Sequence, residues 1–342
     1  MEFLDKLSQY EKSLIFTPRQ GEILRQFYSS YLEAMHDKGT AVTASPPITL
    51  QFIELIAKQI RTPYHFQACH KRLTKPDDYF TFGLEIIRPL VDFQHSVRLG
   101  MENLALIDLR LKQKHNCVLF ANHQTEPDPQ AINLLIEKTY PEIGAEILFV
   151  AGDRVISDPI AVPFSKGRNM LCIYSRKHMD YPPEKKVEKQ QHNRRALQEL
   201  VRKLSTGGQC VYVAPSGGRD RPNAEGVVNV APFDRDAIDL FALMAKESGI
   251  TTHFYPLSLA TTHLLPPPPV VEDEIGEDRV FHYTPIGINF GAEVDMSYGS
   301  DRTDLDKKGQ RQLRCDYIYG KVCEGYQQTL DEMHKKNPNG IF

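Results

Sequence analysis

The sequence lacks an apolar run long enough to cross a membrane. A transmembrane helix needs about 20 consecutive apolar residues, whereas the longest runs here, such as 117–121 and 240–245, hold five and six. The first residues, MEFLDKLSQYEKSL, have neither the apolar core of a secretory signal nor the Arg-rich, acid-poor character of a transit peptide. We therefore expect no transmembrane segment and a cytoplasmic location.

The sequence also lacks a strong excess of one charge. Its 342 residues include 41 Lys and Arg against 44 Asp and Glu, a net charge of -3, and 41% are hydrophobic. This composition excludes a mainly disordered chain and argues against a nucleic-acid partner. The charge is nevertheless uneven, because residues 166–221 contain 13 Lys and Arg against 5 Asp and Glu. Such a basic stretch attracts an acidic substrate or partner.

Several motifs of metal and nucleotide chemistry are missing. The sequence contains no HExxH, GxxxxGK[ST], GxGxxG or GxSxG. No two of its six cysteines have the two-residue separation that is typical of zinc and redox pairs. The cysteines are Cys69, Cys117, Cys172, Cys210, Cys315 and Cys323. We expect buried, reduced thiols and no metal site.

Hydrophobic patterning predicts two parts, residues 1–75 and 76–342. The first part is helical, with Ile23, Phe27 and Tyr31 at four-residue steps. In the second part, apolar runs alternate with amphipathic segments. Strands are expected at 117–121, 146–151, 169–174, 209–214, 252–260 and 280–288, and helices at 49–60, 96–114, 129–138, 184–205, 234–247 and 304–335. This pattern predicts an α/β fold: a mixed, mostly parallel sheet flanked by helices, with a small amino-terminal helical-bundle domain.

A first candidate site, NHQTEPDP at 122–129, directly follows an expected strand. Functional groups of α/β sheets gather at the carboxyl ends of strands. His123 and Asp128 are separated by a turn at Pro127, so the carboxylate can orient the ring and stabilise its protonated form. His123 would then act as a base on a substrate hydroxyl. The alternative is structural: His123 closes the turn and Asp128 caps the next helix.

A second candidate site, PSGGRDRP at 215–222, also follows an expected strand. Its glycines allow close approach to the backbone, and Arg219 and Arg221 offer forked donors, a combination that favours phosphate. The alternative is an ordinary glycine turn with solvated arginines. Lys177 and His178, after the strand expected at 169–174, add basic groups at a third strand end.

Together, NHQTEPD, RKHM and APSGGRDRP resemble the soluble glycerol-3-phosphate acyltransferases of plant plastids and their chlamydial relatives. The resemblance spans most of the chain and is densest from 117 to 222. It implies that His123 is the base and Asp128 its partner. The phosphate-binding residues that it implies are Lys177, His178, Arg219 and Arg221. Two departures are Pro127, where we expect a small residue such as Ala, and the missing plant transit segment.

The resemblance implies transfer of a fatty acyl group from a thioester, carried by acyl carrier protein or coenzyme A, to the sn-1 hydroxyl of glycerol 3-phosphate. The product would be 1-acylglycerol 3-phosphate, in the first step of phospholipid synthesis. Because the thioester is already activated, we expect no cofactor. A transient membrane contact would serve product release.

Two other functions fit the same residues. In a serine hydrolase or thioesterase, Ser216 would be the nucleophile and His123 with Asp128 would complete a triad. In a non-enzymatic docking module, the basic stretch at 166–221 would bind an acidic carrier protein.

Overall fold

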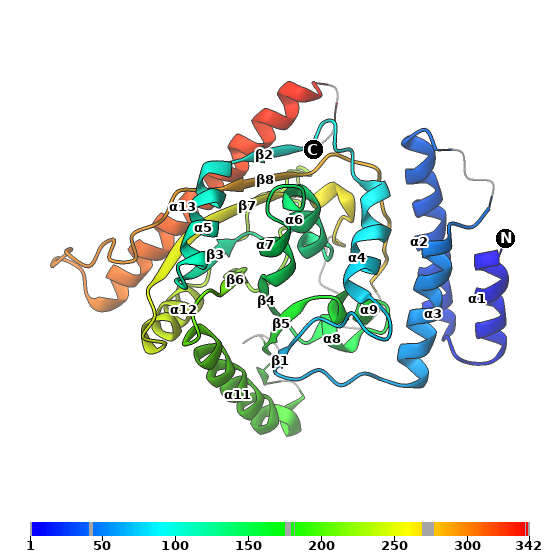
Figure 1. Ribbon diagram of the computed structural model, residues 1–342, viewed down its shortest axis with the longest axis horizontal. Coiled ribbons are helices and arrows are strands. Elements are labelled where there is room, and N and C mark those ends of the chain that lie inside the picture. The colour runs from blue at the N-terminus through cyan, green and yellow to red at the C-terminus, as the bar shows by residue number, and fades with distance from the viewer. Residues whose placement is uncertain are drawn as a thin grey trace.

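A single mixed sheet organises the molecule. The computed structural model describes residues 2–40, 44–174, 179, 180, 182–268, 277–338 and 340. Within these residues the strand order is β1-β5-β4-β6-β3-β7-β8-β2 (Figure 1). The strands are β1 (Cys69–His70), β2 (Val97–Leu99), β3 (Asn116–Ala121), β4 (Leu148–Ala151), β5 (Asn169–Cys172), β6 (Cys210–Val213), β7 (Thr252–Ala260) and β8 (Gly287–Phe290).

The centre of the sheet is parallel. Strand β3 pairs in parallel with β6 and β7, and β4 pairs in parallel with β5 and β6. The antiparallel pairs lie toward the edges, where β1 meets β5 and β8 meets β7. Every residue of β3, β5 and β6 is buried, because helices cover both faces, and these strands therefore have continuous apolar sequences. The structure confirms the predicted α/β fold with a mixed, mostly parallel sheet.

The two faces of the sheet belong to two hydrophobic clusters. Val118 and Phe120 of β3 share a cluster with residues of α11, α12 and α13. Leu119 and Ala121, on the other face, share a cluster with residues of α4 and α6. The helices that follow the amino-terminal three are α4 (Tyr79–Ile87), η1 (Arg88–Leu90), α5 (Met101–Lys112), α6 (Asp128–Ile136), α7 (Pro141–Glu146), α8 (Arg154–Ser157), α9 (Val162–Lys166), η2 (Pro183–Lys185), α11 (Lys186–Leu204), α12 (Arg235–Glu247), η3 (Thr262–Leu264) and α13 (Lys307–Lys336).

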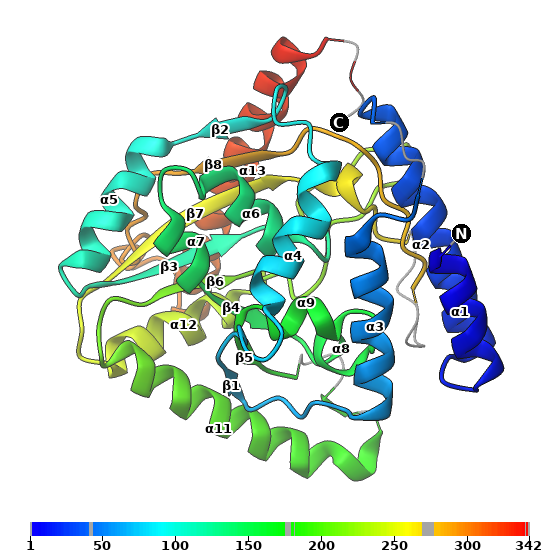
Figure 2. The same ribbon diagram turned by 45° about the vertical axis from the view of Figure 1, so that its right-hand side comes forward.

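Three amino-terminal helices stand together at one side of the molecule (Figure 2). They are α1 (Glu2–Lys12), α2 (Pro18–Asp37) and α3 (Pro47–Arg61). Their aromatic side chains contact the rest of the chain: Phe52 packs on Phe82, with ring centroids 5.9 Å apart, and Phe27 packs on Phe281 at 5.7 Å. The division into domains 1–75 and 76–342 stays a prediction, and the hydrophobic packing crosses that boundary.

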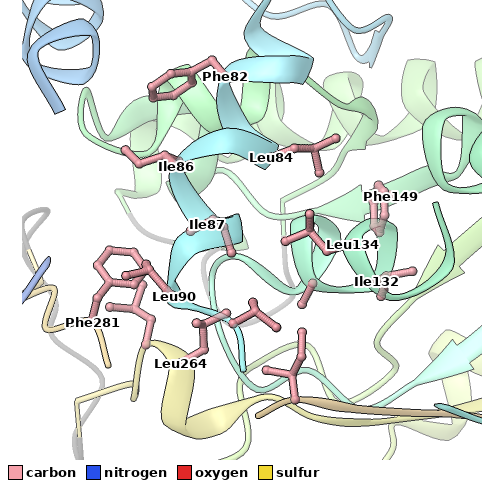
Figure 3. Packing of buried hydrophobic residues seen from close by; sticks show 14 of the residues in the cluster. Phe82, Leu84, Ile86, Ile87, Leu90, Ile132, Leu134, Phe149, Leu264 and Phe281 are labelled. Atoms are coloured by element: carbon pink, nitrogen blue, oxygen red, sulfur yellow. The ribbon is translucent and has the colours of Figure 1, made fainter. Parts of the chain in front are cut away.

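Helix α4 connects the amino-terminal helices to the sheet layer. Phe82 and Ile86 extend from one side of α4, and Leu84 extends toward Leu134 of α6 (Figure 3). All four side chains are nearly or fully buried and belong to one cluster. The core of the amino-terminal helices is therefore continuous with the core on this face of the sheet.

Two expected elements are corrected. The helix expected over 96–114 begins only at Met101, because Val97–Leu99 form β2 beside β8. Gly100 separates the two with a left-handed φ of 64°, and a Cβ there would meet the Phe290 carbonyl. Only residues 287 and 288 of the strand expected over 280–288 belong to a strand, because β8 runs over Gly287–Phe290 and the N–H of Phe281 donates to the Ser30 hydroxyl instead. The other expected strands are present, with ends shifted by at most two residues.

The packing of Phe52 yields a stability prediction. This side chain is 1% exposed and lies among the rings of Phe27, Phe82 and Phe164. Removing a buried aromatic ring leaves a cavity, so Phe52→Ala should lower the free energy of unfolding by about 3–5 kcal/mol. Urea unfolding followed by circular dichroism measures this change.

Phe93, which is 44% exposed, provides the control. Phe93→Ala should cost less than about 1.5 kcal/mol, since nearly half of this side chain is already exposed to water. Equal losses in the two variants would contradict the packing described for Phe52. Two separate unfolding transitions, with only one affected by Phe52→Ala, would support the predicted division into domains.

Candidate active site

The candidate site lies where parallel strands end at the same edge of the sheet. His123 follows β3, Arg219 follows β6, Arg154 follows β4 and Thr261 follows β7. Because β4, β6, β3 and β7 are consecutive in the sheet, their carboxyl ends bring these four loops together. The structure thus gathers residues that are far apart in the sequence at one edge.

The predicted contact between His123 and Asp128 is present. Nδ1 of His123 lies 2.7 Å from Oδ2 of Asp128. The Asp128 side chain is 1% exposed, whereas that of His123 is 31% exposed. Pro127, not Asp128, occupies the cap position of α6, and no side chain caps that helix end. The structure therefore contradicts the helix cap that the structural alternative assigns to Asp128.

Asp128 has other donors besides the imidazole. Its Oδ2 also accepts the backbone N–H groups of Gln124 and Thr125, at 2.8 and 3.3 Å. Its Oδ1 accepts the hydroxyl of Thr261 at 2.6 Å. Several donors around a buried carboxylate satisfy its oxygens and fix its position. The orientation of the His123 ring is set through this carboxylate.

Asp220 joins the glycine-arginine loop to the histidine turn. Its backbone N–H donates to the carbonyl of His123 at 2.6 Å. Its carboxylate accepts the side-chain amides of Asn122 and Gln124, at 2.8 and 3.3 Å, and the backbone N–H of Ala231 at 2.8 Å. Burial raises the pKa of the Asp220 carboxyl, although these donors act in the opposite direction. The residues on both sides of His123 are thus bound to one buried side chain.

Arg219 and Arg221 lie in the loop that Asp220 anchors. The guanidinium of Arg219 forms an ion pair with Glu277. Arg221 donates to the backbone carbonyls of Pro268 and Arg219, at 3.2 and 3.1 Å. Burial, together with the nearby charge of Arg219, lowers the pKa of Arg221. The direct hydrogen bond between Asp220 and His123 brings this arginine loop beside the predicted base.

A network of acidic and basic side chains continues from this loop. Glu277 also contacts Arg154, whose Nη1 lies 3.3 Å from its Oε1. Arg279, two residues on, is 5% exposed and pairs with Glu126 at 2.9 Å and with Asp158 at 2.7 Å. Burial by itself would raise the pKa of the Glu126 carboxyl, but the charges of Arg279 and Arg219 outweigh burial and lower this pKa. Glu126 belongs to the histidine turn, so the network supports that turn from a second side.

Two predicted residues, Lys177 and His178, lie outside the described residues. Ser216 is described, and its hydroxyl donates to the carbonyl of Gly218 at 2.8 Å. Gly217, between them, has a left-handed φ of 65°, a conformation for which glycine is favoured. The Ser216 hydroxyl thus donates a hydrogen bond within its own loop.

Sequence reasoning missed four residues of the site. Glu277 and Arg279 lie beyond the segments that the motifs cover, and no local pattern connects them to His123, whereas Thr261 directly follows the strand expected over 252–260. Arg154 did have a signal, because it comes three residues after an expected strand. The strand order places the end of β4 beside that of β6, and this order is not visible in the local sequence.

The part of the chain that the structure describes contains neither a candidate metal site nor a candidate membrane-spanning helix. No described group of three or more His, Cys, Asp or Glu side chains is arranged to hold a metal ion. None of the described helices combines the length and the apolar character that crossing a membrane requires.

The six cysteines are free thiols, and burial raises the pKa of the most enclosed ones, to about 12 for Cys172 and Cys210.

The fold and the site define an acyltransferase domain. The protein-family model described as Acyltransferase matches residues 102–260, which include His123, Asp128, Arg219 and Arg221. The match covers the central strands β3 to β7 and the loops that carry the candidate base and the arginines.

Comparison with curated proteins identifies the family. The chain is 40% identical over 278 residues to the chloroplastic glycerol-3-phosphate acyltransferase of Arabidopsis thaliana, covering 80% of this chain and 60% of the relative. It is 37% identical over 316 residues to that of Pisum sativum, covering 92% and 68%. The corresponding protein of Spinacia oleracea is 39% identical over 303 residues, covering 87% and 63%. The chain belongs to the family of these glycerol-3-phosphate acyltransferases, which confirms the resemblance seen in the sequence. It spans about three fifths of the length of the first relatives that it matches.

From the ion pair between Glu126 and Arg279 we predict how the free energy of unfolding depends on pH. The pKa of Glu126 is lower in the folded state than its usual value of 4.5. The ion pair therefore stabilises the fold fully above pH 4.5, and this stabilisation is lost as the pH falls through the lowered pKa. Glu126→Gln should therefore reduce the free energy of unfolding at neutral pH by about 1.5–3 kcal/mol, as expected for hydrogen bonds to a charged group. The difference from the wild type should shrink as the pH falls below 4.5.

Urea unfolding between neutral and acidic pH measures this difference. Asp278→Asn is the matched control, because Asp278 pairs with Arg19 at the surface and is 48% exposed. It should cost no more than about 1 kcal/mol at any pH. A Glu126→Gln deficit that stays constant across the pH range would show that the carboxylate charge is not what stabilises the pair.

Proposed function

We propose that this protein transfers a fatty acyl group from a thioester donor to the sn-1 hydroxyl of glycerol 3-phosphate, forming 1-acylglycerol 3-phosphate. The observation that carries the proposal is the hydrogen bond between Asp220 and His123, which brings the candidate base beside the arginine loop. Membership of the glycerol-3-phosphate acyltransferase family supports the same reaction. One substrate that carries both a hydroxyl and a phosphate would use both parts of the site.

His123 would act as the general base. Since Nδ1 lies against Asp128, it carries the proton of that hydrogen bond, and the lone pair of Nε2 is available. No described residue hydrogen-bonds Nε2, and the side chain is partly exposed. Nε2 would take the hydroxyl proton as the oxygen attacks the thioester carbonyl. The imidazolium would then return a proton to the departing thiolate, and Asp128 would stabilise the ring charge between the two steps.

Arg219 and Arg221 would bind the phosphate and so orient the hydroxyl toward His123. Forked guanidinium donors match the geometry of phosphate oxygens. Lys177 and His178 would complete this phosphate site, as the family resemblance implies. Holding the phosphate at a fixed distance from the base turns binding energy into orientation of the reacting hydroxyl.

The acyl donor is proposed only as a thioester of acyl carrier protein or coenzyme A. Both donors are acidic, and the basic stretch at 166–221 would attract either of them. We further propose that the protein acts in the cytoplasm, with a transient membrane contact for product release. The relatives are named as chloroplastic proteins.

Replacement of His123 tests its role as the base. His123→Ala should reduce kcat by about 10²–10⁴-fold, which is the usual contribution of general base catalysis. The reason is that no other group would take the hydroxyl proton. Binding of glycerol 3-phosphate should change by less than about threefold, since the phosphate site is intact. Labelled glycerol 3-phosphate with each thioester donor measures turnover, and calorimetry measures binding.

His95 offers a closely matched control. Its Nδ1 lies 2.6 Å from a carboxylate oxygen of Asp92, and its side chain is 32% exposed, so it repeats the His–Asp contact outside the site. His95→Ala should keep near-normal turnover. Near-normal turnover by His123→Ala would instead remove His123 from the base role.

Replacement of Ser216 separates direct transfer from the hydrolase mechanism. In direct transfer no acyl-enzyme forms, so Ser216→Ala should keep kcat within about threefold of the wild type. Mass spectrometry after rapid quenching of the wild-type reaction should detect no acyl group on Ser216. An acylated Ser216, together with loss of turnover in the alanine variant, would establish the hydrolase mechanism instead.

A further inference from the structure

Strand register brings Thr261 to the histidine turn. Strand β7 pairs in parallel with β3, and Ala121, at the end of β3, lies beside Leu257. Because β7 continues to Ala260, its last residues run alongside the turn that follows β3. Asn122 joins the two segments there, since its Oδ1 accepts the backbone N–H of Leu259 at 2.8 Å. Thr261 is the next residue after β7 and is 1% exposed.

Gln124 fixes the backbone of Thr261 against the histidine turn. Its side-chain oxygen Oε1 accepts the backbone N–H of Thr261 at 2.6 Å, and the residue is fully buried. The backbone N–H of Gln124 donates to Oδ2 of Asp128 at 2.8 Å. One buried residue therefore holds both the end of β7 and the carboxylate. The branched side chain of Thr261 has few rotamers, so its hydroxyl is also fixed in direction.

The two oxygens of Asp128 have different partners. Oδ2 lies 2.7 Å from Nδ1 of His123 and also accepts two backbone N–H groups of the turn. Within the described part of the chain, the hydroxyl of Thr261 is the one donor to Oδ1, at 2.6 Å. A buried carboxylate oxygen without a donor is costly. Without this hydroxyl, the carboxylate would turn toward another donor and lose its alignment with the imidazole.

We propose that Thr261 is a positioning residue whose hydroxyl fixes the carboxylate of Asp128 and, through it, the ring of His123. The inference rests on the proposed function, in which Nε2 of His123 takes the proton of the substrate hydroxyl. Proton transfer requires the base to lie within hydrogen-bond reach of that hydroxyl. A ring that is free to turn meets this requirement less often, whereas the phosphate-binding arginines stay in place. Thr261 therefore supports kcat and not the affinity for glycerol 3-phosphate.

The competing explanation is that Thr261 only closes the end of β7. In that case its hydroxyl stabilises the fold, and its removal changes neither the ring of His123 nor the rate of the chemical step in a folded variant. The two explanations are separated by the kinetic constants and by the state of the ring nitrogens.

The first experiment measures turnover with labelled glycerol 3-phosphate and each thioester donor. Thr261→Val keeps the branched shape and removes the hydroxyl. Its kcat should fall by about tenfold to a hundredfold, the effect expected for loss of a hydrogen bond to a carboxylate. The KM for glycerol 3-phosphate should stay within about threefold, since the phosphate site is intact. Thr261→Ser restores the donor and should recover most of the lost kcat.

Thr262 provides the matched control. It is the next residue, it is 7% exposed, and its backbone N–H also donates to Gln124, at 3.1 Å. Its hydroxyl is buried and has no hydrogen-bond partner among the residues that the structure describes. Thr262→Val should therefore keep kcat within about threefold. Thermal unfolding of every variant shows whether it is folded at the temperature of the assay.

The second experiment uses ¹⁵N NMR of histidine-labelled protein at alkaline pH, where imidazole rings are neutral. The ¹⁵N shifts show which ring nitrogen carries the proton, and the signals missing from His123→Ala identify His123. In the wild type, Nδ1 of His123 should carry the proton, because it faces Asp128. Thr261→Val should give a mixture of the two tautomers. Thr261→Ser and Thr262→Val should keep the wild-type spectrum.

Four results would overturn the inference. The first is a folded Thr261→Val that keeps kcat within about threefold. The second is a wild-type nitrogen spectrum in this variant. The third is an equal loss of kcat in Thr262→Val, which would show that any change at the end of β7 has the same effect. The fourth is a Thr261→Ser variant that recovers no turnover.

Failure of the inference is distinguishable from failure of the proposed function. A wild type that transfers acyl groups, together with any of these four results, would overturn the inference alone. A wild type that transfers no acyl group would overturn the proposed function. The nitrogen spectra would then still decide whether Thr261 fixes the ring of His123, because they do not depend on turnover.

Discussion

The parallel pairing of β3 with β6, in which Cys117 lies beside Cys210 and Phe120 beside Val213, positions the chemistry of this protein. Both strands end at the same edge of the sheet, and the loops that follow them meet where the N–H of Asp220 donates to the carbonyl of His123. The two residues are nearly a hundred positions apart in the sequence, yet their separation is fixed by strand register and one backbone hydrogen bond. A shift of register in β6 would move the arginines away from His123 and separate the candidate site without changing any of its side chains.

Two buried carboxylates hold the histidine turn in place, and they do so differently. Asp128 orients the imidazole, and its other donors come from the turn itself and from Thr261. Asp220 contacts the side chains of Asn122 and Gln124, which flank the histidine. Burying a carboxylate is costly unless its oxygens find donors, so each cluster is stable only in its complete form. Two buried carboxylates therefore fix the position of the turn, although its histidine is partly exposed.

Much of this site could be predicted from the sequence because its motifs directly follow strands. The apolar runs before His123 and Arg219 identified two strand ends, and the carboxyl-end rule for α/β sheets then brought them together. Glu277 could not be found in this way, since its role depends on where the chain after β7 returns to the sheet. The short β2 was also missed: three residues do not establish a periodicity, and the left-handed Gly100 that separates it from α5 is recognised only when the carbonyl of Phe290 is seen beside it. Local patterns predict elements, whereas contacts between distant segments depend on packing.

A cluster of guanidinium groups must satisfy two opposing requirements. For the proposed function it has to bind phosphate strongly enough to orient a small substrate, yet the like charges of Arg154, Arg219 and Arg221 repel one another in a partly buried site. Burial, together with that repulsion, lowers the pKa of Arg221. A carboxylate such as Glu277 relieves the repulsion and stabilises the folded loops. The same carboxylate necessarily reduces the attraction for any other anion, because each guanidinium donor that it accepts is no longer available. The stability of these loops and their attraction for an anion are therefore coupled through the side chain of Glu277.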